Sequence, residues 1–194
     1  MKIDTSQIYF PAEDTRLLIR AALREAKLSD RVLEVGTGSG AVAKAVMGIT
    51  SRTVATEINP HAAMYAAGEG VPVVRGNLLD PLCGEFDLIL FNAPYLPTQP
   101  EERLDDWLEC ALDGGASGRE IIEKFLPAAA DHLSKSGRIV LLVSSITGLP
   151  ELLSRCKQRG MIGIIADSEQ MEDGEILYVL RISHVCRHAE AARL

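Results

Sequence analysis

Apolar and polar residues follow two different rhythms along this chain, which predict strands and helices in turn. Five short runs are apolar nearly throughout, a pattern typical of strands buried on both faces. They span residues 32–35, 53–56, 71–74, 86–91 and 138–143. Helical stretches precede or separate them at residues 12–27, 39–48, 60–68, 118–133 and 149–159. This alternation predicts a parallel sheet with helices on both faces.

The end of the chain breaks the alternation. Residues 161–166 and 176–182 are predicted to be two strands, and the polar residues 167–175 between them leave no room for a crossover helix. Strands joined in this way form a hairpin, so one of them runs antiparallel to the rest of the sheet. The sequence therefore predicts an α/β fold with a seven-stranded, mostly parallel sheet and a C-terminal antiparallel hairpin. Class I methyltransferases have this architecture.

Composition and charge narrow the class of protein. The chain has 194 residues, of which 47% are hydrophobic and 24% charged, and nothing in it marks a linker, so we expect one domain over residues 1–194. A net charge of -7 weighs against nucleic acid as a partner and suits a small molecule or a basic protein. With no apolar signal core and no membrane-spanning stretch, we expect a cytoplasmic protein without a membrane anchor.

The cysteines give no sign of a metal site. Cys83, Cys110, Cys156 and Cys186 are too far apart for a Cys-x-x-Cys metal or redox motif. We therefore expect mostly structural thiols and no bound metal.

A glycine-rich turn follows the first predicted strand. Gly36, Gly38 and Gly40 stand where that strand ends and a helix begins, and glycines there allow a tight turn and close approach by a ligand. Together with Ala41, the first two glycines also satisfy the G-x-G-x-x-A dinucleotide fingerprint. The turn alone therefore leaves three interpretations open: a site for S-adenosylmethionine (AdoMet), a site for NAD, or a purely structural turn.

Neighbouring residues favour AdoMet. Glu34, just before the glycines, suits the cationic amino group of a methionine moiety, whereas a carboxylate beside a pyrophosphate would repel it. Glu57 closes the second strand and can accept hydrogen bonds from both ribose hydroxyls, although it could equally serve as a charge at a helix N-terminus. Asn77 and Leu78, after the third strand, suit the edge and the face of adenine.

The residues Asn92-Ala93-Pro94-Tyr95 directly follow the fourth predicted strand. A plain turn is one interpretation, but ligands in open α/β sheets sit beyond strand ends near the switch point, which the first and fourth strands flank. The Asn92 side-chain oxygen and the Ala93 carbonyl can each accept one N–H of a planar amide or amine, on which Tyr95 would stack. Such acceptors stabilise charge that develops on nitrogen. We therefore predict N-methyl transfer, with Asn92, Pro94 and Tyr95 as catalytic residues.

The motifs together resemble one family. The glycine turn, the segment 92–95, the segment 9–15 (YFPAEDT) and the segment 113–120 (DGGASGRE) are similar, in this order, to HemK-type protein glutamine methyltransferases. The likeness is to the short archaeal and eukaryotic branch that modifies class-1 translation release factors. It implies an AdoMet-dependent N-methyltransferase acting on the glutamine of a Gly-Gly-Gln loop. Ala93 stands where the family usually has proline, and Asn77 where an acid is common.

The resemblance also implies roles for particular residues. AdoMet would be bound by Thr15, Glu34, Gly36, Gly38, Gly40, Glu57, Asn77, Leu78 and Asn92. An N-terminal helical segment, residues 1–30, would cover this site. The substrate glutamine would be held by Asn92, Ala93, Pro94, Tyr95 and Leu96.

A partner is implied as well. Members of this branch commonly bind a small zinc-containing activator subunit by pairing at a sheet edge, which here would be the third strand, from Val71 to Val74. Pro72 within that run suits an edge strand. It could equally do no more than protect a free edge.

Two other functions stay open from the sequence. The chemistry of the segment 92–95 would serve any planar N–H donor, so an exocyclic amine of adenine or guanine could be methylated after base flipping. A non-catalytic nucleotide-binding partner subunit would instead bind its ligand without transfer. The acidic balance weighs against the first alternative, and the presence of both Asn92 and Tyr95 against the second.

Overall fold

The computed structural model describes residues 2–99, 101 and 106–185. Its strands are β1 (Val32–Val35), β2 (Thr53–Glu57), β3 (Val73–Arg75), β4 (Phe86–Asn92), β5 (Leu133–Ser144), β6 (Met161–Gln170) and β7 (Ile176–His184). Its α-helices are α1 (Glu13–Glu25), α2 (Ala41–Met47), α3 (Pro60–Gly68), α4 (Glu120–His132) and α5 (Leu149–Gln158). The short 3-10 helices given by the described residues include η1 (Thr5–Gln7), η3 (Glu109–Ala111) and η4 (Ser145–Thr147).

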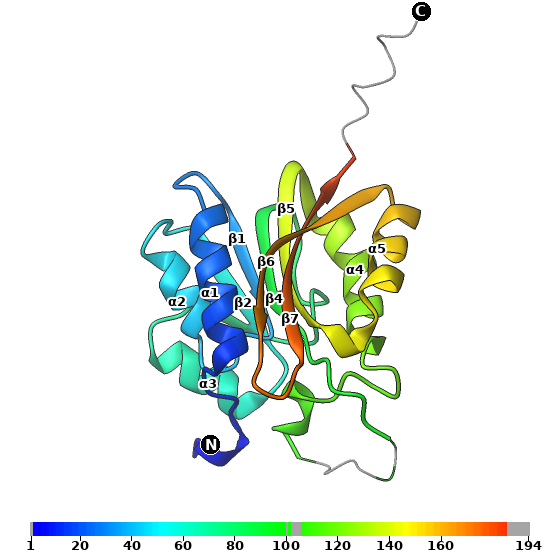
Figure 1. Ribbon diagram of the computed structural model, residues 1–194. Helices are drawn as coiled ribbons and strands as arrows, with labels where there is room; N and C mark the ends of the chain where they lie inside the picture. Colours follow the sequence, from blue (N-terminus) through cyan, green and yellow to red (C-terminus); the bar gives the residue numbers. More distant parts are fainter. Residues whose placement is uncertain (1, 100, 102–105, 186–194) are drawn as a thin grey trace, which may run out of the picture.

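The strands form one seven-stranded sheet in the order β3-β2-β1-β4-β5-β7-β6 (Figure 1). The pairs from β3 through β5 are parallel, whereas β7 runs antiparallel to both β5 and β6. The predicted fold, a mostly parallel sheet ending in an antiparallel hairpin, is confirmed. Because β1 lies between β2 and β4, the strand order reverses there, and the carboxyl ends of β1 and β4 meet at the switch point.

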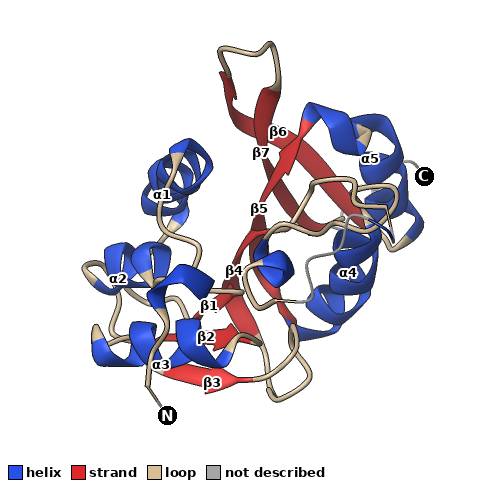
Figure 2. Cartoon of the chain, turned by 90° about the horizontal axis from the view of Figure 1, so that it is seen from below, coloured by secondary structure: helices blue, strands red, loops and turns tan. Residues whose placement is uncertain are grey.

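Helices cover both faces of the sheet. Figure 2 shows α1, α2 and α3 on one face and α4 and α5 on the other. Successive residues of β4 serve the two sides in turn: Leu88 and Leu90 pack in the core beneath α1 and α2, while Ile89 and Phe91 pack in the core with Phe125 of α4. Burial on both faces is the reason why the predicted strands are apolar nearly throughout.

The edge strand β3 starts at Val73, two residues later than predicted. Pro72 has no N–H with which to extend the ladder, although its carbonyl still accepts from Ala55 at 2.8 Å. Val71 is 3% exposed and packs with Ala66 in a small core beneath α3. Val71 is apolar because it is buried in this contact, and not because it lies in a strand.

The hairpin strand β6 is longer than predicted and continues to Gln170. The residues Asp167 and Glu169 suggested a loop because they are charged. In the structure they lie on the strand and pair with Arg20 of α1, at 2.9 and 3.2 Å. β5 starts at residue 133, five residues before the predicted start. This part of the strand was missed because residues 134–136 are polar and only partly buried or exposed.

The helices match the predicted ranges, with ends one or two residues inside them for α1, α2 and α4. None of the helices in the described part of the chain is both long and apolar enough to cross a membrane.

Candidate active site

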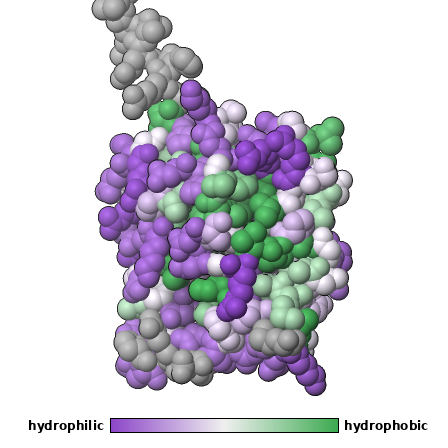
Figure 3. All heavy atoms as spheres, turned by 180° about the vertical axis from the view of Figure 1, so that it is seen from behind, coloured by the Kyte–Doolittle hydropathy of each residue, from purple (hydrophilic) through white to green (hydrophobic). Residues whose placement is uncertain are grey.

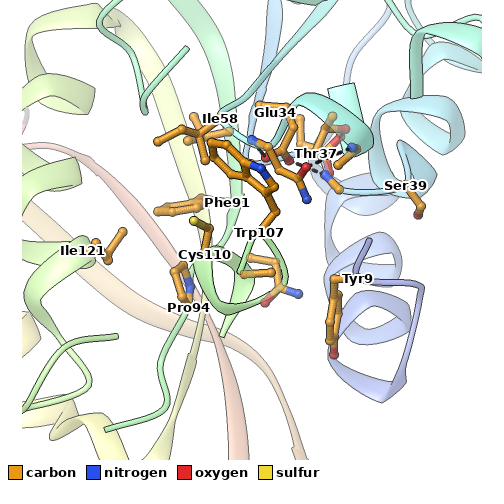
Figure 4. A pocket seen from close by; sticks show the side chains of 18 of the residues that line it. Tyr9, Glu34, Thr37, Ser39, Ile58, Phe91, Pro94, Trp107, Cys110 and Ile121 are labelled. Carbon is orange, nitrogen blue, oxygen red and sulfur yellow. Dashed lines mark hydrogen bonds between the residues drawn. The ribbon is translucent and has the colours of Figure 1, made fainter. Parts of the chain in front are cut away.

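A cavity of about 610 Å³ lies at the carboxyl ends of β1, β2, β3 and β4. Its size is within the usual range for small-molecule sites. Figure 4 shows side chains reaching it from separate elements: Thr37 and Ser39 from the glycine turn, Tyr9 from the N-terminal segment, and Trp107 from the segment after β4. Eight of the predicted cofactor residues line it, namely Thr15, Glu34, Gly36, Gly38, Glu57, Asn77, Leu78 and Asn92.

The glycine turn that borders this cavity is built from left-handed residues. Gly36, Gly38 and Gly40 have φ angles of +61°, +56° and +85°, a region that favours glycine. A Cβ on Gly38 would also lie 3.3 Å from the main-chain oxygen of Tyr9, closer than most such contacts. The turn therefore requires glycine both for its backbone conformation and for the chain that passes over it.

Gly40 is the one predicted cofactor residue that does not line the cavity. A Cβ there would lie 3.0 Å from Val71 Cγ2 and 3.1 Å from Ala66 Cβ. Its missing side chain lets the start of α2 approach α3 closely. In this structure Gly40 thus has a packing role, and the prediction that it contacts the cofactor finds no support in the geometry.

Glu34 is a buried acid at the end of β1, with 3% of its surface exposed. Its Oε2 accepts hydrogen bonds from the Thr37 hydroxyl and, at 2.8 Å, from the Ala43 N–H. Burial raises the pKa of the Glu34 carboxyl to about 8, and these hydrogen bonds oppose the shift. A cation placed beside it would favour the ionised form.

Glu57 links the ends of β1 and β2. One carboxylate oxygen accepts from the Gly38 N–H at 2.7 Å and the other from the Asn59 N–H at 2.9 Å. Burial raises the pKa of Glu57, and the hydrogen bonds from Asn59 and Gly38 oppose this. Asn59 caps α3, so Glu57 does support a helix start, as one interpretation held. Each oxygen still has a lone pair with which to accept from a hydroxyl.

Leu78 has an unusual backbone. Its φ of +46° is the one positive value for a non-glycine residue within residues 2–99, 101 and 106–185. A bulky residue rarely adopts this conformation, and such outliers cluster at functional sites. The Asp80 N–H donates to the Asn77 carbonyl at 3.0 Å and closes a turn. Leu78 lies in this turn and lines the cavity.

Asn92, the last residue of β4, has a fixed orientation and an unused acceptor. Its Nδ2 donates to Asp14 Oδ2 at 2.9 Å, and because an ionised carboxylate can only accept, this bond decides which way the amide points. Asn92 Oδ1 is buried and has no hydrogen-bond partner in the described part of the chain. Asp14 is 5% exposed and also accepts from the Tyr9 hydroxyl at 3.0 Å.

The residues after Asn92 lie in different places. Pro94 lines the same cavity, while Tyr95 and Asp14 line an adjoining cavity of about 360 Å³. Burial and the Asp14 carboxylate raise the pKa of Tyr95, so its phenol stays neutral. Ala93 is 1% exposed and Leu96 is 40% exposed, and neither lines either cavity.

Sequence reasoning missed two residues of this site. Asp14 stands in the segment 9–15 that the family resemblance used, but no pattern reveals that it meets Asn92, 78 positions away. Trp107 lines the cavity opposite the glycine turn, and a lone tryptophan in a polar loop gives no signal of that position. No cluster of three or more metal-binding side chains occurs in residues 2–99, 101 and 106–185.

Comparison with known proteins places this geometry in a family, although no protein-family model matches the chain. A Methanocaldococcus jannaschii protein, provisionally named a protein N5-glutamine methyltransferase, is 38% identical over 162 residues, which cover 79% of this chain and 81% of that protein. The Mus musculus methyltransferase HEMK2 is 36% identical over 192 residues, covering 91% and 89%. The chain belongs to the HemK-type protein glutamine methyltransferases.

A solved structure agrees with this membership. The HemK-type chain superposes on a chain of the E. cuniculi Mtq2–Trm112 complex with a TM-score of 0.78 and 29% identity, covering 92% of this chain and 99% of that one. That complex is described as responsible for methylating the eRF1 translation termination factor. The family, the class I methyltransferase fold and the enzyme class inferred from the motifs are confirmed.

Proposed function

We propose that this chain transfers a methyl group from AdoMet to the side-chain amide nitrogen of a glutamine in the Gly-Gly-Gln loop of a class-1 translation release factor. The observation that carries the proposal is the buried, unpartnered Oδ1 of Asn92, held in place by Asp14. An amide nitrogen is a weak nucleophile because its lone pair is delocalised. An oxygen that accepts a hydrogen bond from the amide N–H stabilises the positive charge that develops on the nitrogen.

We infer that the 610 Å³ cavity holds the cofactor. AdoMet, when bound, supplies an electrophilic methyl group on a sulfonium centre. The residues present fit such a group, since the buried carboxyl of Glu34 suits its cationic amino group and the two oxygens of Glu57 suit its ribose hydroxyls. Thr15, Gly36, Gly38, Asn77 and Leu78 would complete the binding site.

The chain's own residues would prepare the nitrogen for attack. Asn92 Oδ1, which lacks a partner among the described residues, would accept one of its N–H groups. The carbonyl of the buried Ala93 would accept the other, and the neutral ring of Tyr95, which lines the adjoining cavity, would stack on the amide plane. The nitrogen would gain the methyl group as S-adenosylhomocysteine leaves, and the methylated amide nitrogen would lose one proton to water, so no strong base is needed beforehand. Pro94 would hold the turn that aims these groups.

The relatives and the charge support a protein substrate. One relative is named for N5-glutamine methylation, and the Mtq2–Trm112 complex methylates a termination factor. A net charge of -7 attracts a basic loop and repels a polyanion. We further propose that residues 1–194 act as one methyltransferase domain, whose segment 1–30 covers the cofactor, because Tyr9, Pro11 and Thr15 line the cavity.

Methylation with labelled AdoMet tests the proposal. Wild-type release factor, the same factor with its Gly-Gly-Gln glutamine changed to alanine, and DNA and RNA are compared, with the activator subunit present. Label should enter only the wild-type factor. Label in adenine or guanine of nucleic acid would favour the base-methylating alternative, and cofactor binding without transfer to any acceptor would favour a non-catalytic subunit.

We also propose that a small zinc-binding activator subunit pairs with the exposed edge of β3. The bonds from Ala55 N–H to the Pro72 carbonyl and from Gly76 N–H to the Glu57 carbonyl set the ladder so that the main-chain groups of Val73 and Arg75 point away from β2. These groups are available to another strand. The partner named in the Mtq2–Trm112 complex supports this choice.

The surface at this end of the sheet is apolar as well. Figure 3 shows the face opposite to β6 and β7, with apolar side chains gathered in its middle. Val54 of β2 and Val74 of β3 are half-buried and lie on the same face of the sheet, whereas Val73 is half-buried on the other face, against the small core beneath α3. A patch beside an open strand edge suits a partner that both pairs with the strand and covers its side chains.

Co-purification with the activator tests this interface. Val73→Asp should abolish co-purification because it places a charge on the paired edge. Ile162→Asp, on the other sheet edge where Ile162 is 55% exposed, should leave it unchanged. Thermal melting of both variants checks that they fold. Retained binding by Val73→Asp, or loss by Ile162→Asp, would contradict the proposed interface.

A further inference from the structure

Residues 4–10 form a strap beside the large cavity, which Tyr9 of this strap lines. Gln7 is anchored by its main chain, since its carbonyl accepts from Asn59 Nδ2 of the α3 cap at 2.6 Å. Further on, Tyr9 lines the cavity and its main-chain oxygen lies against Gly38 of the glycine turn. The strap is thus attached to the glycine turn and to α3, on one side of the cavity.

Trp107 lies in the segment after β4 and meets the strap there. Its side chain lines the cavity, and the Arg75 guanidinium lies 6.0 Å from the centre of its ring. Its main-chain N–H donates to Gln7 Oε1 at 2.9 Å, across 100 residues of sequence. Figure 4 shows both side chains among those that line the cavity, Trp107 in the middle of the view and Tyr9 to its right. The Gln7–Trp107 hydrogen bond therefore joins two segments that are otherwise anchored to different elements.

We propose that Gln7 and Trp107 form a clasp over the cofactor cavity, and that this clasp opens each time AdoMet is exchanged for S-adenosylhomocysteine. The inference rests on the proposed function in one respect, namely that this cavity holds the cofactor. The Gln7 Oε1 and the Trp107 N–H bond to each other, and Gln7 does not line the cavity. The clasp is therefore a barrier that the ligand meets both when it enters and when it leaves.

This arrangement has a kinetic signature that a ligand contact lacks. Removing a group that touches the ligand speeds release and weakens affinity in proportion. Removing a clasp speeds both association and release and leaves the dissociation constant nearly unchanged. For one neutral hydrogen bond the expected change in each rate is about fivefold.

The experiment measures S-adenosylhomocysteine binding by stopped-flow fluorescence. Trp107 is the single tryptophan of the chain and lines the cavity, so its emission reports on the ligand directly. Release of radiolabelled ligand, followed by rapid filtration, gives a second readout. Gln7→Ala removes the acceptor, Gln7→Glu keeps an acceptor at the same length, and Gln158→Ala changes an exposed glutamine at the end of α5 as the matched control.

Gln7→Ala should raise both rates about fivefold and keep the dissociation constant within about twofold. Gln7→Glu and Gln158→Ala should behave as wild type. Rates for Gln7→Ala equal to those for Gln158→Ala would overturn the clasp, as would faster release with a proportional loss of affinity. If wild-type protein shows no binding by calorimetry, the assignment of the cavity to the cofactor fails and the clasp with it. That result differs from normal wild-type binding with an unaffected Gln7→Ala variant, which refutes the clasp alone.

Discussion

The carboxyl ends of β1 and β4 lie side by side but are built in opposite ways. At the end of β1, the carboxyl of Glu34 is bonded to Thr37 and Ala43, both within nine positions of it. At the end of β4, Asn92 depends on Asp14, which comes from the start of α1. One oxygen of Asn92 has no partner in the described chain. The hydrogen bonds at the β1 end are thus made by residues close in sequence. The β4 end is assembled from distant segments and has one side-chain acceptor, Asn92 Oδ1, without a partner in the described chain.

This difference indicates a division of labour. A side chain such as Glu34, whose hydrogen bonds to the protein are already made, stabilises the turn and can bind the cofactor equally before and during the reaction. An acceptor without a partner can respond to charge that develops only during the reaction. Changes at the β4 end should therefore lower kcat, and changes at the β1 end should alter cofactor affinity and stability.

The largest effect is expected for Asn92→Ala. It removes the acceptor aimed at the glutamine N–H, so kcat should fall about 100- to 1000-fold, as for the loss of one transition-state hydrogen bond elsewhere. The dissociation constant of AdoMet should change only a few-fold. Methyl-transfer kinetics and calorimetry measure the two quantities separately.

Asn77→Ala is the control variant, because Asn77 lines the cofactor cavity but follows β3 and is not part of the β4 end. It should raise KM for AdoMet and leave kcat nearly unchanged. If Asn92→Ala kept kcat within a few-fold of wild type, the division between the two strand ends would be wrong.

The next largest effect is expected for Asp14→Asn. Asp14 accepts two hydrogen bonds at Oδ2, from Tyr9 and Asn92, and two at Oδ1, from the N–H and the hydroxyl of Thr15. An amide at this position adds a donor, which would turn the Asn92 amide over and point its oxygen away from the site. Misplacement of this kind should lower kcat about 10- to 100-fold while cofactor affinity changes less.

Glu13→Gln is the matched control for Asp14→Asn. Glu13 is the neighbouring acid, and its side chain is 62% exposed and pairs with Arg16 on the helix surface. Its loss should leave kcat unchanged. Equal effects of the two substitutions on kcat would mean that Asp14 acts only through overall charge.

The same contrast explains how much the sequence could predict. The glycine turn could be located because Gly36, Gly38 and Glu34 are neighbours in sequence and their chemistry follows from local geometry. The bond between Asp14 and Asn92 could not, because it depends on where α1 packs on the sheet. Gly40 was predicted to bind the cofactor because a glycine needed for helix packing looks the same in a sequence as one needed for a ligand, and its contact with the cofactor stays a prediction. The strand residues Asp167 and Glu169 were missed because a distant arginine satisfies their charges.

Glu34, at the end of β1, should make AdoMet binding depend on pH. Burial raises the pKa of Glu34 to about 8, so below that pH its carboxyl must lose a proton before it can pair with the cationic amino group of AdoMet. Affinity should therefore rise with pH, about tenfold per unit below pH 8. Calorimetry in buffers of different ionisation enthalpy should show a proton released on binding at pH 7. In Glu34→Gln both the rise and the proton release should disappear.

The free energy of unfolding should fall with rising pH, whereas AdoMet affinity should rise. The folded pKa of Glu34 is above its ordinary value of 4.5, so its contribution to stability is full below pH 4.5 and is lost as pH rises through about 8. Urea unfolding of the ligand-free protein at a series of pH values measures this loss. Glu34→Gln should lack that part of the pH dependence, and an unchanged profile would mean that Glu34 does not titrate in this range.

The smallest effect is expected for a pair of glycines, Gly40 and Gly70, with φ of +85° and +90°. Alanine at either position adopts a left-handed backbone at a cost of about 1–2 kcal/mol. At Gly70 nothing lies within 4 Å of the added Cβ, whereas at Gly40 it meets Val71 and Ala66 at 3.0 and 3.1 Å. Gly40→Ala should therefore be less stable than Gly70→Ala by about 1 kcal/mol, which corresponds to a difference of about 2–4 °C in Tm. Cofactor affinity should be unchanged in both variants, because Gly40 does not line the cavity. A selective loss of AdoMet binding in Gly40→Ala would support the prediction that Gly40 contacts the cofactor, and equal melting temperatures would contradict its packing role.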